Sequence, residues 1–273
     1  MENKTHKRFF GRPFAITSVA VLGAMILLYE VLNISLTDNE ILSPIVNMTV
    51  TRTLGALVFA ICVLHLGYRV MDPLRKPIGK SLLFILPCLA VVINNFPIIS
   101  AIRGDAYLDS PWYYVLIYAA QCIAVATFEE LAFRGVVFLY LLEKRRKTVR
   151  GVFIAIVITS AVFGLIHLLN LLEGSSPIPV LMQIGYSFLI GGMCSVVLVK
   201  TANIWLCVLL HAIFNFCGQL MPTLGKGTWW DTPTIVITVL LAVAVTVYIV
   251  LSLFKITPQE TDRLFKTENT PII

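Results

Sequence analysis

The sequence predicts an all-α, polytopic membrane protein with about eight transmembrane helices and both termini in the cytoplasm. Of its 273 residues, 58% are hydrophobic and only 13% are charged, and the mean hydropathy is +0.88. An ordinary soluble domain has about 25% charged residues. Apolar runs of the ~20 residues that cross a ~30 Å hydrocarbon layer recur along the chain. Basic residues gather in alternate connections between these runs, as the positive-inside rule expects.

The apolar runs define the predicted helices in order. The first follows a basic segment, but it is too long for a signal peptide and lacks a clear cleavage site, so we expect a retained helix. The fourth is longer than one crossing needs, and two prolines, Pro87 and Pro97, interrupt the third. Because no soluble region or repeat separates the runs, residues 1–273 are expected to form one integral membrane domain. The runs are residues 13–33, 52–71, 81–102, 112–142, 151–171, 178–199, 203–221 and 232–254.

The charge bias fixes the predicted orientation. With a cytoplasmic amino terminus, only Arg52, Arg103 and Lys226 fall on the outer side. The net charge of +6 then reflects topology and contact with anionic lipid headgroups, so nucleic acid is not an expected partner. The basic residues predicted on the cytoplasmic side are Lys4, Lys7, Arg8, Arg12, Arg69, Arg75, Lys76, Lys80, Lys144, Arg145, Arg146, Lys147, Arg150, Lys200, Lys255, Arg263 and Lys266.

The cysteines carry no recognisable motif. They show no CxxC spacing, and all fall within predicted spans. We interpret them as small apolar core residues. The six are Cys62, Cys88, Cys122, Cys194, Cys207 and Cys217.

Three charged residues interrupt the fourth apolar run, in the sequence TFEELAFRG. A charge at mid-bilayer costs at least about 2.5–3.5 kcal/mol, so such groups indicate a functional site. Glu130 and Arg134 are four residues apart in the order that favours a helical ion pair, and we assign them to structural support. Glu129 lies about 100° around the helix and is assigned to chemistry. The alternative is an ion network that holds helices together or lines a water-filled crevice.

Two of the four histidines lie in polar stripes of predicted helices. His167 has Phe163 one turn earlier, and His211 has Asn215 one turn later on the same face. A histidine and an amide on one stripe must face protein or water, because lipid offers them no partner. His6, in the basic tail, and His65, alone on the second helix, are interpreted as non-catalytic.

Helix geometry brings the polar residues to similar depth. At ~1.5 Å per residue, Glu129 lies ~22 Å from Lys144, His167 ~25 Å from Arg150, and His211 ~16 Å from Lys200. All three basic markers are predicted to be cytoplasmic. The spacing therefore indicates one buried site built by three helices.

These residue types suit water-mediated acyl transfer. Glu129, paired with His167, could deprotonate a water molecule for attack on a peptide carbonyl. His211 and Asn215 could donate hydrogen bonds to the developing oxyanion. The chain has no HExxH zinc helix, no GxGD aspartate pair and no Gly-x-Ser-x nucleophile inside a span.

The ordered motifs Glu129-Glu130-x-x-x-Arg134, Phe163-x-x-x-His167 and His211-x-x-x-Asn215 resemble those of the CAAX-protease and bacteriocin-processing (CPBP, or Abi) family of intramembrane proteases. The resemblance covers about residues 112–220, the expected catalytic core. It implies that Glu129 activates water, that His167 is its partner, and that His211 and Asn215 stabilise the oxyanion. It also implies a membrane-associated peptide or prenylated protein as substrate, and the compact chain favours a bacterial plasma membrane.

The sequence leaves several alternatives open. We favour a mechanism without a metal, because Asn215 suits an oxyanion better than a zinc second shell. If zinc is used, Glu129, His167 and His211 could supply three ligands. A non-catalytic scaffold or bacteriocin immunity protein is the main functional alternative. Proton-coupled transport also uses buried Glu and His residues, but the two halves show no repeat.

Overall fold

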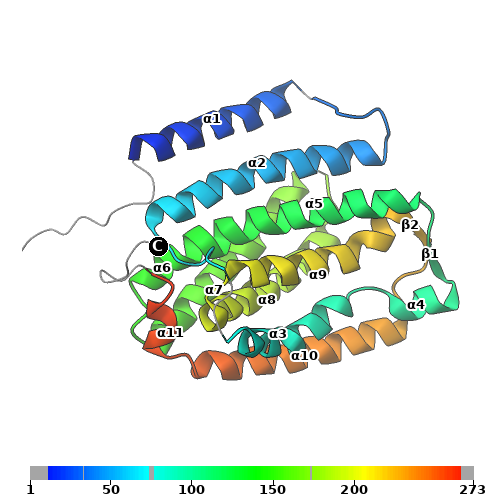
Figure 1. The fold of residues 1–273 in the computed structure, drawn as a ribbon. Coiled ribbons are helices and arrows are strands. Elements are labelled where there is room, and N and C mark those ends of the chain that lie inside the picture. The colour runs from blue at the N-terminus through cyan, green and yellow to red at the C-terminus, as the bar shows by residue number, and fades with distance from the viewer. Residues whose placement is uncertain (1–11, 33, 74–76, 173, 266–273) are drawn as a thin grey trace, which may run out of the picture.

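The computed structural model describes residues 12–32, 34–73, 77–172 and 174–265. These residues form a bundle of helices whose long axes run nearly parallel (Figure 1). Five helical segments of the described chain are long and apolar enough to cross a membrane, and two further helices contain shorter apolar stretches, Ile16–Tyr29 and Ile78–Ile93. The chain is thus an all-α, multi-pass membrane protein. The number of eight spans stays a prediction.

The elements follow the predicted apolar runs closely in the second half of the chain and less closely in the first half. In chain order they are α1 (Arg12–Val31), α2 (Leu42–Leu66), α3 (Ile78–Ile93), α4 (Ile98–Arg103), β1 (Ala106–Leu108), α5 (Trp112–Glu130), the π-helical turn η1 (Leu131–Phe138), α6 (Leu139–Glu143), α7 (Val149–Leu165), the 3-10 helix η2 (Ile166–Leu171), α8 (Pro177–Thr201), α9 (Ile204–Leu224), β2 (Gly225–Gly227), α10 (Thr232–Phe254) and α11 (Pro258–Asp262).

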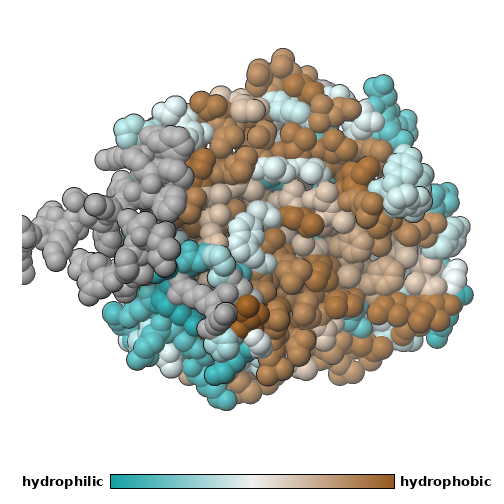
Figure 2. Space-filling model, in the orientation of Figure 1, coloured by the Kyte–Doolittle hydropathy of each residue, from teal (hydrophilic) through white to brown (hydrophobic). Residues whose placement is uncertain are grey.

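In Figure 1, α5 and α9 lie side by side on the near face of the bundle, with α7 and α8 behind them. α5 packs between α2 and α9, and α8 packs against α7, α9 and α10. Within the described residues α1 packs against α2 and against no other helix. Figure 2 shows a broad hydrophobic surface, with hydrophilic residues gathered at the ends of the helices, most densely around α11. This distribution is what a bilayer requires of the lipid-facing surface.

The second predicted span begins too late. The expected outer connection, residues 34–51, is helical from Leu42 onwards, so Arg52 lies inside α2 rather than outside the bundle. The polar residues that lowered the apolar average satisfy their hydroxyl groups within the helix: Thr49 donates to the carbonyl of Ile45 at 2.7 Å, and Thr53 donates to that of Thr49 at 2.7 Å. Such back-bonding lets a Thr-rich stretch remain helical in an apolar setting.

The third predicted span, 81–102, is broken between α3 and α4. Pro97 has no N–H group to continue the helix. The asparagines of the break are held by other helices: Asn94 donates to the Thr238 hydroxyl at 2.9 Å, and Asn95 donates to the carbonyl of Phe214 at 3.0 Å. The chain then enters β1, which pairs antiparallel with the distant β2 in a two-stranded sheet that the sequence did not predict.

The fourth predicted span is one continuous rod, in which α5 passes through η1 into α6. The next connection ends at Thr148, whose hydroxyl accepts from the N–H of Gly151 at 3.1 Å and starts α7. Asn203 caps α9 in the same way, accepting from the N–H of Leu206 at 3.2 Å. These caps set the starts of the two helices that carry the histidine motifs.

Several predictions fall outside the described residues. They concern His6 and the basic residues Lys4, Lys7 and Arg8, together with Arg75, Lys76 and Lys266. The cytoplasmic location of both termini therefore stays a prediction.

Candidate active site

The site begins where α5 changes its winding. Glu129 and Glu130 are the last residues of α5, and Arg134 lies in the π-helical turn η1. A single π-helical turn inside an α-helix often occurs at functional sites. Gly135 permits close packing here, because a Cβ at this position would lie 2.7 Å from Cγ2 of Val63 on α2.

Glu130 and Arg134 form the ion pair that their spacing predicts. Arg134 Nη1 lies 3.1 Å from Glu130 Oε1, and both residues are 0% exposed. The guanidinium carbon also lies 4.4 Å from the centre of the Phe163 ring. Within the described residues, no guanidinium N–H is well directed at an acceptor, so the contact is mainly electrostatic. The two charges compensate each other in a place that water does not reach.

His211 on α9 connects the two glutamates. Its Nδ1 lies 2.8 Å from Glu130 Oε1, and its Nε2 lies 3.5 Å from Glu129 Oε2. The first distance is that of a hydrogen bond, whereas the second is longer than a good one. Glu130 therefore holds Arg134 and His211 through a single oxygen, and the imidazole presents its other nitrogen to Glu129.

The two glutamates differ in their access to water. The side chain of Glu130 is 0% exposed, whereas that of Glu129 is 17% exposed. Only Glu129 can therefore meet a water molecule without rearrangement of the core. This difference agrees with the assignment of Glu129 to chemistry and Glu130 to support.

The motif of Phe163 and His167 lies next to His211 and Glu129. Phe163 on α7 is buried, and its ring packs edge-on against His167 at 5.6 Å and against His211 at 5.9 Å between ring centres. His167 lies in η2, is partly buried, and is close enough for electrostatic interaction with Glu129 and His211. Within the described residues no ion pair or hydrogen bond joins Glu129 to His167. The direct partner of Glu129 is His211.

Asn215 lies one turn after His211 on α9 and is partly buried. Its side chain makes no hydrogen bond to any residue that the structure describes. An amide with free donors on this stripe agrees with the oxyanion role expected of it, which stays a prediction.

Sequence reasoning missed the contact between His211 and Glu130 and the residues that make room for Arg134. A Cβ on Gly191 of α8 would lie 3.0 Å from Arg134 Nη2 and 3.1 Å from Oγ of Ser160 on α7. The guanidinium thus fills the space that a side chain at position 191 would need. Small residues on both neighbouring helices are the only sequence signal of this, and small residues are common in membrane helices.

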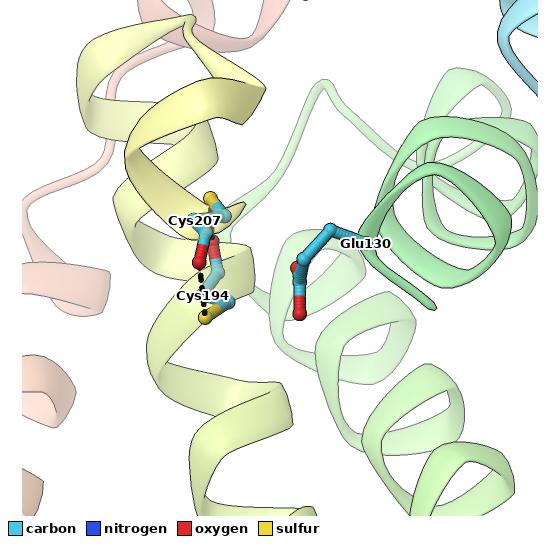
Figure 3. A group of neighbouring side chains, drawn as sticks. All are labelled: Glu130, Cys194 and Cys207. Atoms are coloured by element: carbon cyan, nitrogen blue, oxygen red, sulfur yellow. Dashed lines mark hydrogen bonds between the residues drawn. The ribbon is translucent and has the colours of Figure 1, made fainter. Parts of the chain in front are cut away.

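The donor atoms do not fit the zinc site considered from the sequence. Glu129, His167 and His211 do not bring three donor atoms within 4.8 Å of one another; among the described residues, Glu130, Cys194 and Cys207 do (Figure 3). Both thiols already contact backbone carbonyls, Cys207 Sγ lying 3.2 Å from the carbonyl oxygen of Cys194. This group is therefore interpreted as core packing. The absence of a metal from the reaction stays a prediction.

Comparison with known proteins agrees with the motif analysis. Residues 111–217 match the family model described as type II CAAX prenyl endopeptidase Rce1-like. The matched segment runs from the start of α5 into α9 and contains every residue assigned above to the site. No curated protein and no solved structure matches the chain significantly. The predicted resemblance to CAAX endopeptidases is confirmed for this segment.

Proposed function

We propose that this chain, whose residues 111–217 match the Rce1-like family model, is an intramembrane endopeptidase in which Glu129 activates water. The observation that carries the proposal is the position of His211 between two carboxylates, 2.8 Å from Glu130 and 3.5 Å from Glu129. One carboxylate fixes the ring, and the other faces the partly exposed side of the site. Two carboxylates with different environments around one imidazole are typical of acid–base catalysis.

The proposed reaction uses the chain's own side chains. Glu129 accepts a proton from water while the water oxygen bonds to the carbonyl carbon of the peptide. The oxyanion that forms accepts hydrogen bonds from His211 and Asn215. Collapse of this intermediate breaks the C–N bond, and the proton held by Glu129 passes to the leaving nitrogen. The carboxylate is then restored for the next turnover.

The surrounding residues have positioning roles in this proposal. In a protonated imidazole both nitrogens are donors, so Nδ1 of His211 is held by Glu130 while Nε2 remains available for the oxyanion. Arg134, 3.1 Å from Glu130 Oε1, holds this carboxylate in place. His167, across Phe163 from His211, remains the predicted second partner of Glu129.

The substrate proposed is a membrane-associated peptide or a prenylated protein, which agrees with the similarity to CAAX prenyl endopeptidases. Membrane lipid surrounds the site, and we propose a cell membrane, of bacterial type, as its location. No specific observation favours a non-catalytic scaffold or a bacteriocin immunity protein.

The test is cleavage of an internally quenched, prenylated CAAX peptide by detergent-purified protein, beside a non-prenylated control. Glu129→Gln keeps the size of the side chain and removes the base, so the rate should fall about 10²- to 10⁴-fold. Glu143→Gln is the matched control, since it makes the same chemical change at the end of the same rod. A strong chelator should leave the wild-type rate unchanged.

Retained cleavage by Glu129→Gln would contradict the assigned base. A rate abolished by the chelator and restored by zinc would contradict the metal-free mechanism while leaving the endopeptidase assignment intact. No cleavage of either peptide by the wild type would contradict the proposed substrate class.

A further inference from the structure

The 3-10 helix η2, which carries His167, contributes no fully buried residue to the core. Only His167 and Asn170 of its six residues are partly buried. A 3-10 helix places side chains three residues apart above one another. His167 and Asn170 therefore form the one edge of η2 that faces the protein. The other four residues are apolar and exposed: Ile166, Leu168, Leu169 and Leu171.

Asn170 ties this edge to α8. Its Nδ2 donates to Oε1 of Gln183 at 2.8 Å. A second contact joins the same two parts of the chain three residues before His167, near the end of α7. There a Cβ on Gly164 would lie 2.8 Å from the carbonyl oxygen of Ile184. His167 thus lies midway between two points, at Gly164 and Asn170, where the chain meets neighbouring residues of α8.

The same turn of α8 faces the candidate active site. Tyr186, one turn after Gln183, packs its ring against that of Phe214 on α9, at 5.4 Å between ring centres. Tyr186 is also close enough to Glu129 for electrostatic interaction. This turn therefore has η2 on one side and side chains of the site on the other. A displacement of η2 from α8 would move the histidine of η2 away from Glu129.

The conformation of η2 depends on a contact of this kind. Hydrogen bonds in a 3-10 helix have poor geometry, and runs longer than about four residues are uncommon. η2 has six residues, and its apolar side chains point away from the core. Within the described residues, the bond from Asn170 to Gln183 is the only side-chain hydrogen bond that η2 makes.

We infer that Asn170 and Gln183 are positioning residues, whose hydrogen bond holds η2 against α8 so that the imidazole of His167 stays beside Glu129. The inference rests on the proposed endopeptidase function, in which His167 is the second partner of Glu129. Both residues lie outside the three motifs, and Gln183 lies on a helix that carries no motif residue. Their effect on the reaction passes through His167.

The first test measures cleavage of the quenched, prenylated peptide. Asn170→Leu and Gln183→Met approximately keep the size of each side chain and remove the hydrogen bond. Each should lower kcat about 10- to 100-fold, the range for a small misplacement of a reacting group, and leave KM nearly unchanged. The double variant should lose no more than either single one, because both act through one bond. Asn170→Gln/Gln183→Asn keeps the combined length of the two amides and should recover much of the rate.

Asn47→Leu is the matched control. It removes another part-buried side-chain hydrogen bond between two helices, the one that the Tyr29 hydroxyl of α1 donates to Asn47 Oδ1 at 2.8 Å. Because α1 packs only against α2 among the described helices, this change lies away from η2. The kcat of Asn47→Leu should equal that of the wild type. An equal loss of kcat in Asn47→Leu and Asn170→Leu would overturn the inference.

The His167→Ala background separates positioning from a merely structural role. In this background Asn170→Leu should cause no further loss of kcat, since no imidazole remains to be positioned. A further loss as large as that in the wild-type background would overturn the inference, because Asn170 would then act on the reaction without His167.

Chemical modification tests the inference without cleavage. Diethyl pyrocarbonate acylates accessible imidazoles, and mass spectrometry of the peptide that contains His167 gives the rate. This rate should rise about 2- to 10-fold in Asn170→Leu, the range for loss of one hydrogen bond, and stay unchanged in Asn47→Leu. Equal rates in Asn170→Leu and the wild type would overturn the inference. A higher rate in Asn170→Leu, together with no cleavage by the wild type, would support the positioning of His167 and contradict the proposed protease.

Discussion

The regions around Arg134 and Arg52 each place a guanidinium charge inside the helix bundle, but the surroundings of the two charges differ. Both guanidinium groups lie over a phenylalanine ring inside the helix bundle, at 4.4 Å for Arg134 and 4.9 Å for Arg52. Arg134 is fully buried and paired with Glu130, which also holds His211. Arg52 is half-buried, borders a cavity and forms no ion pair with a carboxylate among the residues that the structure describes. The first arginine is compensated inside the core, and the second lies beside a cavity with an aromatic ring as its neighbour.

The comparison explains why the two positions should respond differently to mutation. Replacing one partner of a buried pair leaves the other charge uncompensated and costs about 3–5 kcal/mol. Removing an unpaired charge that borders water leaves nothing uncompensated. Burial and pairing, rather than charge alone, decide the contribution of each arginine to stability.

The largest expected effect is at Arg134. Arg134→Met should lower the unfolding free energy by about 3–5 kcal/mol, because it leaves the buried Glu130 side chain without its ion-pair partner. Arg52→Met, the matched control, should change it by less than about 1 kcal/mol. Thermal unfolding in detergent, followed by a thiol-reactive dye that reports the exposed cysteines, would measure both.

The double variant Glu130→Gln/Arg134→Met sharpens this prediction. Because it removes both charges, it should recover part of the stability lost in Arg134→Met, although His211 loses its charged partner and activity should stay low. Equal stability of Arg134→Met and Arg52→Met would show that the Glu130–Arg134 pair does not stabilise the fold.

A smaller effect is expected from the space around the buried guanidinium. Gly191→Ala would place a methyl group 3.0 Å from Arg134 Nη2 and should cost about 1–3 kcal/mol through overpacking. Gly185 lies on the same helix and has no atom within 4 Å of an added Cβ, so Gly185→Ala should be neutral or slightly stabilising. The same unfolding measurement compares the two, and an equal loss in both variants would indicate a general effect on α8.

The sequence predicts one of the two arginine environments well. The Glu130–Arg134 pair depends on local spacing along one helix, so it could be read directly from TFEELAFRG. The contact between Glu130 and His211 depends on how α9 is rotated against α5, which local periodicity does not determine. The predicted depth of the three motifs indicates that they meet in one site, but it does not indicate which side chains contact one another there.

Arg52 was misplaced for a different physical reason. The start of α2 has a low average hydropathy, because it contains Asn47, Thr49, Thr51 and Arg52. A stretch of this kind is predicted to be a connection outside the membrane rather than part of a helix. In the structure, threonine hydroxyls bond back to the helix and the polar stripe faces a cavity. A hydropathy average depends on residue type alone, so it does not show which side of a helix has access to water.

A third arginine extends the comparison to the hydrophilic end of the bundle and carries the smallest effect. Arg146 lies 4.7 Å over the Phe265 ring, and its Nε donates to Asp262 Oδ1 at 2.6 Å. This bond, with a contribution from Lys147, holds the pKa of Asp262 below its usual value of 3.8. A carboxyl group with a lowered pKa in the folded state stabilises the fold above its unfolded pKa and loses that contribution as the pH falls through the folded pKa.

Asp262→Asn should therefore reduce stability at pH 7 by about 0.2–1 kcal/mol, the range for exposed ion pairs. The difference from wild type should shrink below pH 4 and vanish once Asp262 itself is protonated. Glu40→Gln, at an exposed position that makes no ion pair within the described chain, should show no such dependence. Thermal unfolding in detergent between pH 7 and pH 3 would measure the three proteins together. A stability difference that persists at pH 3 would mean that Asp262 acts through packing, and that the graded effect from Arg134 to Arg146 does not follow from charge and burial.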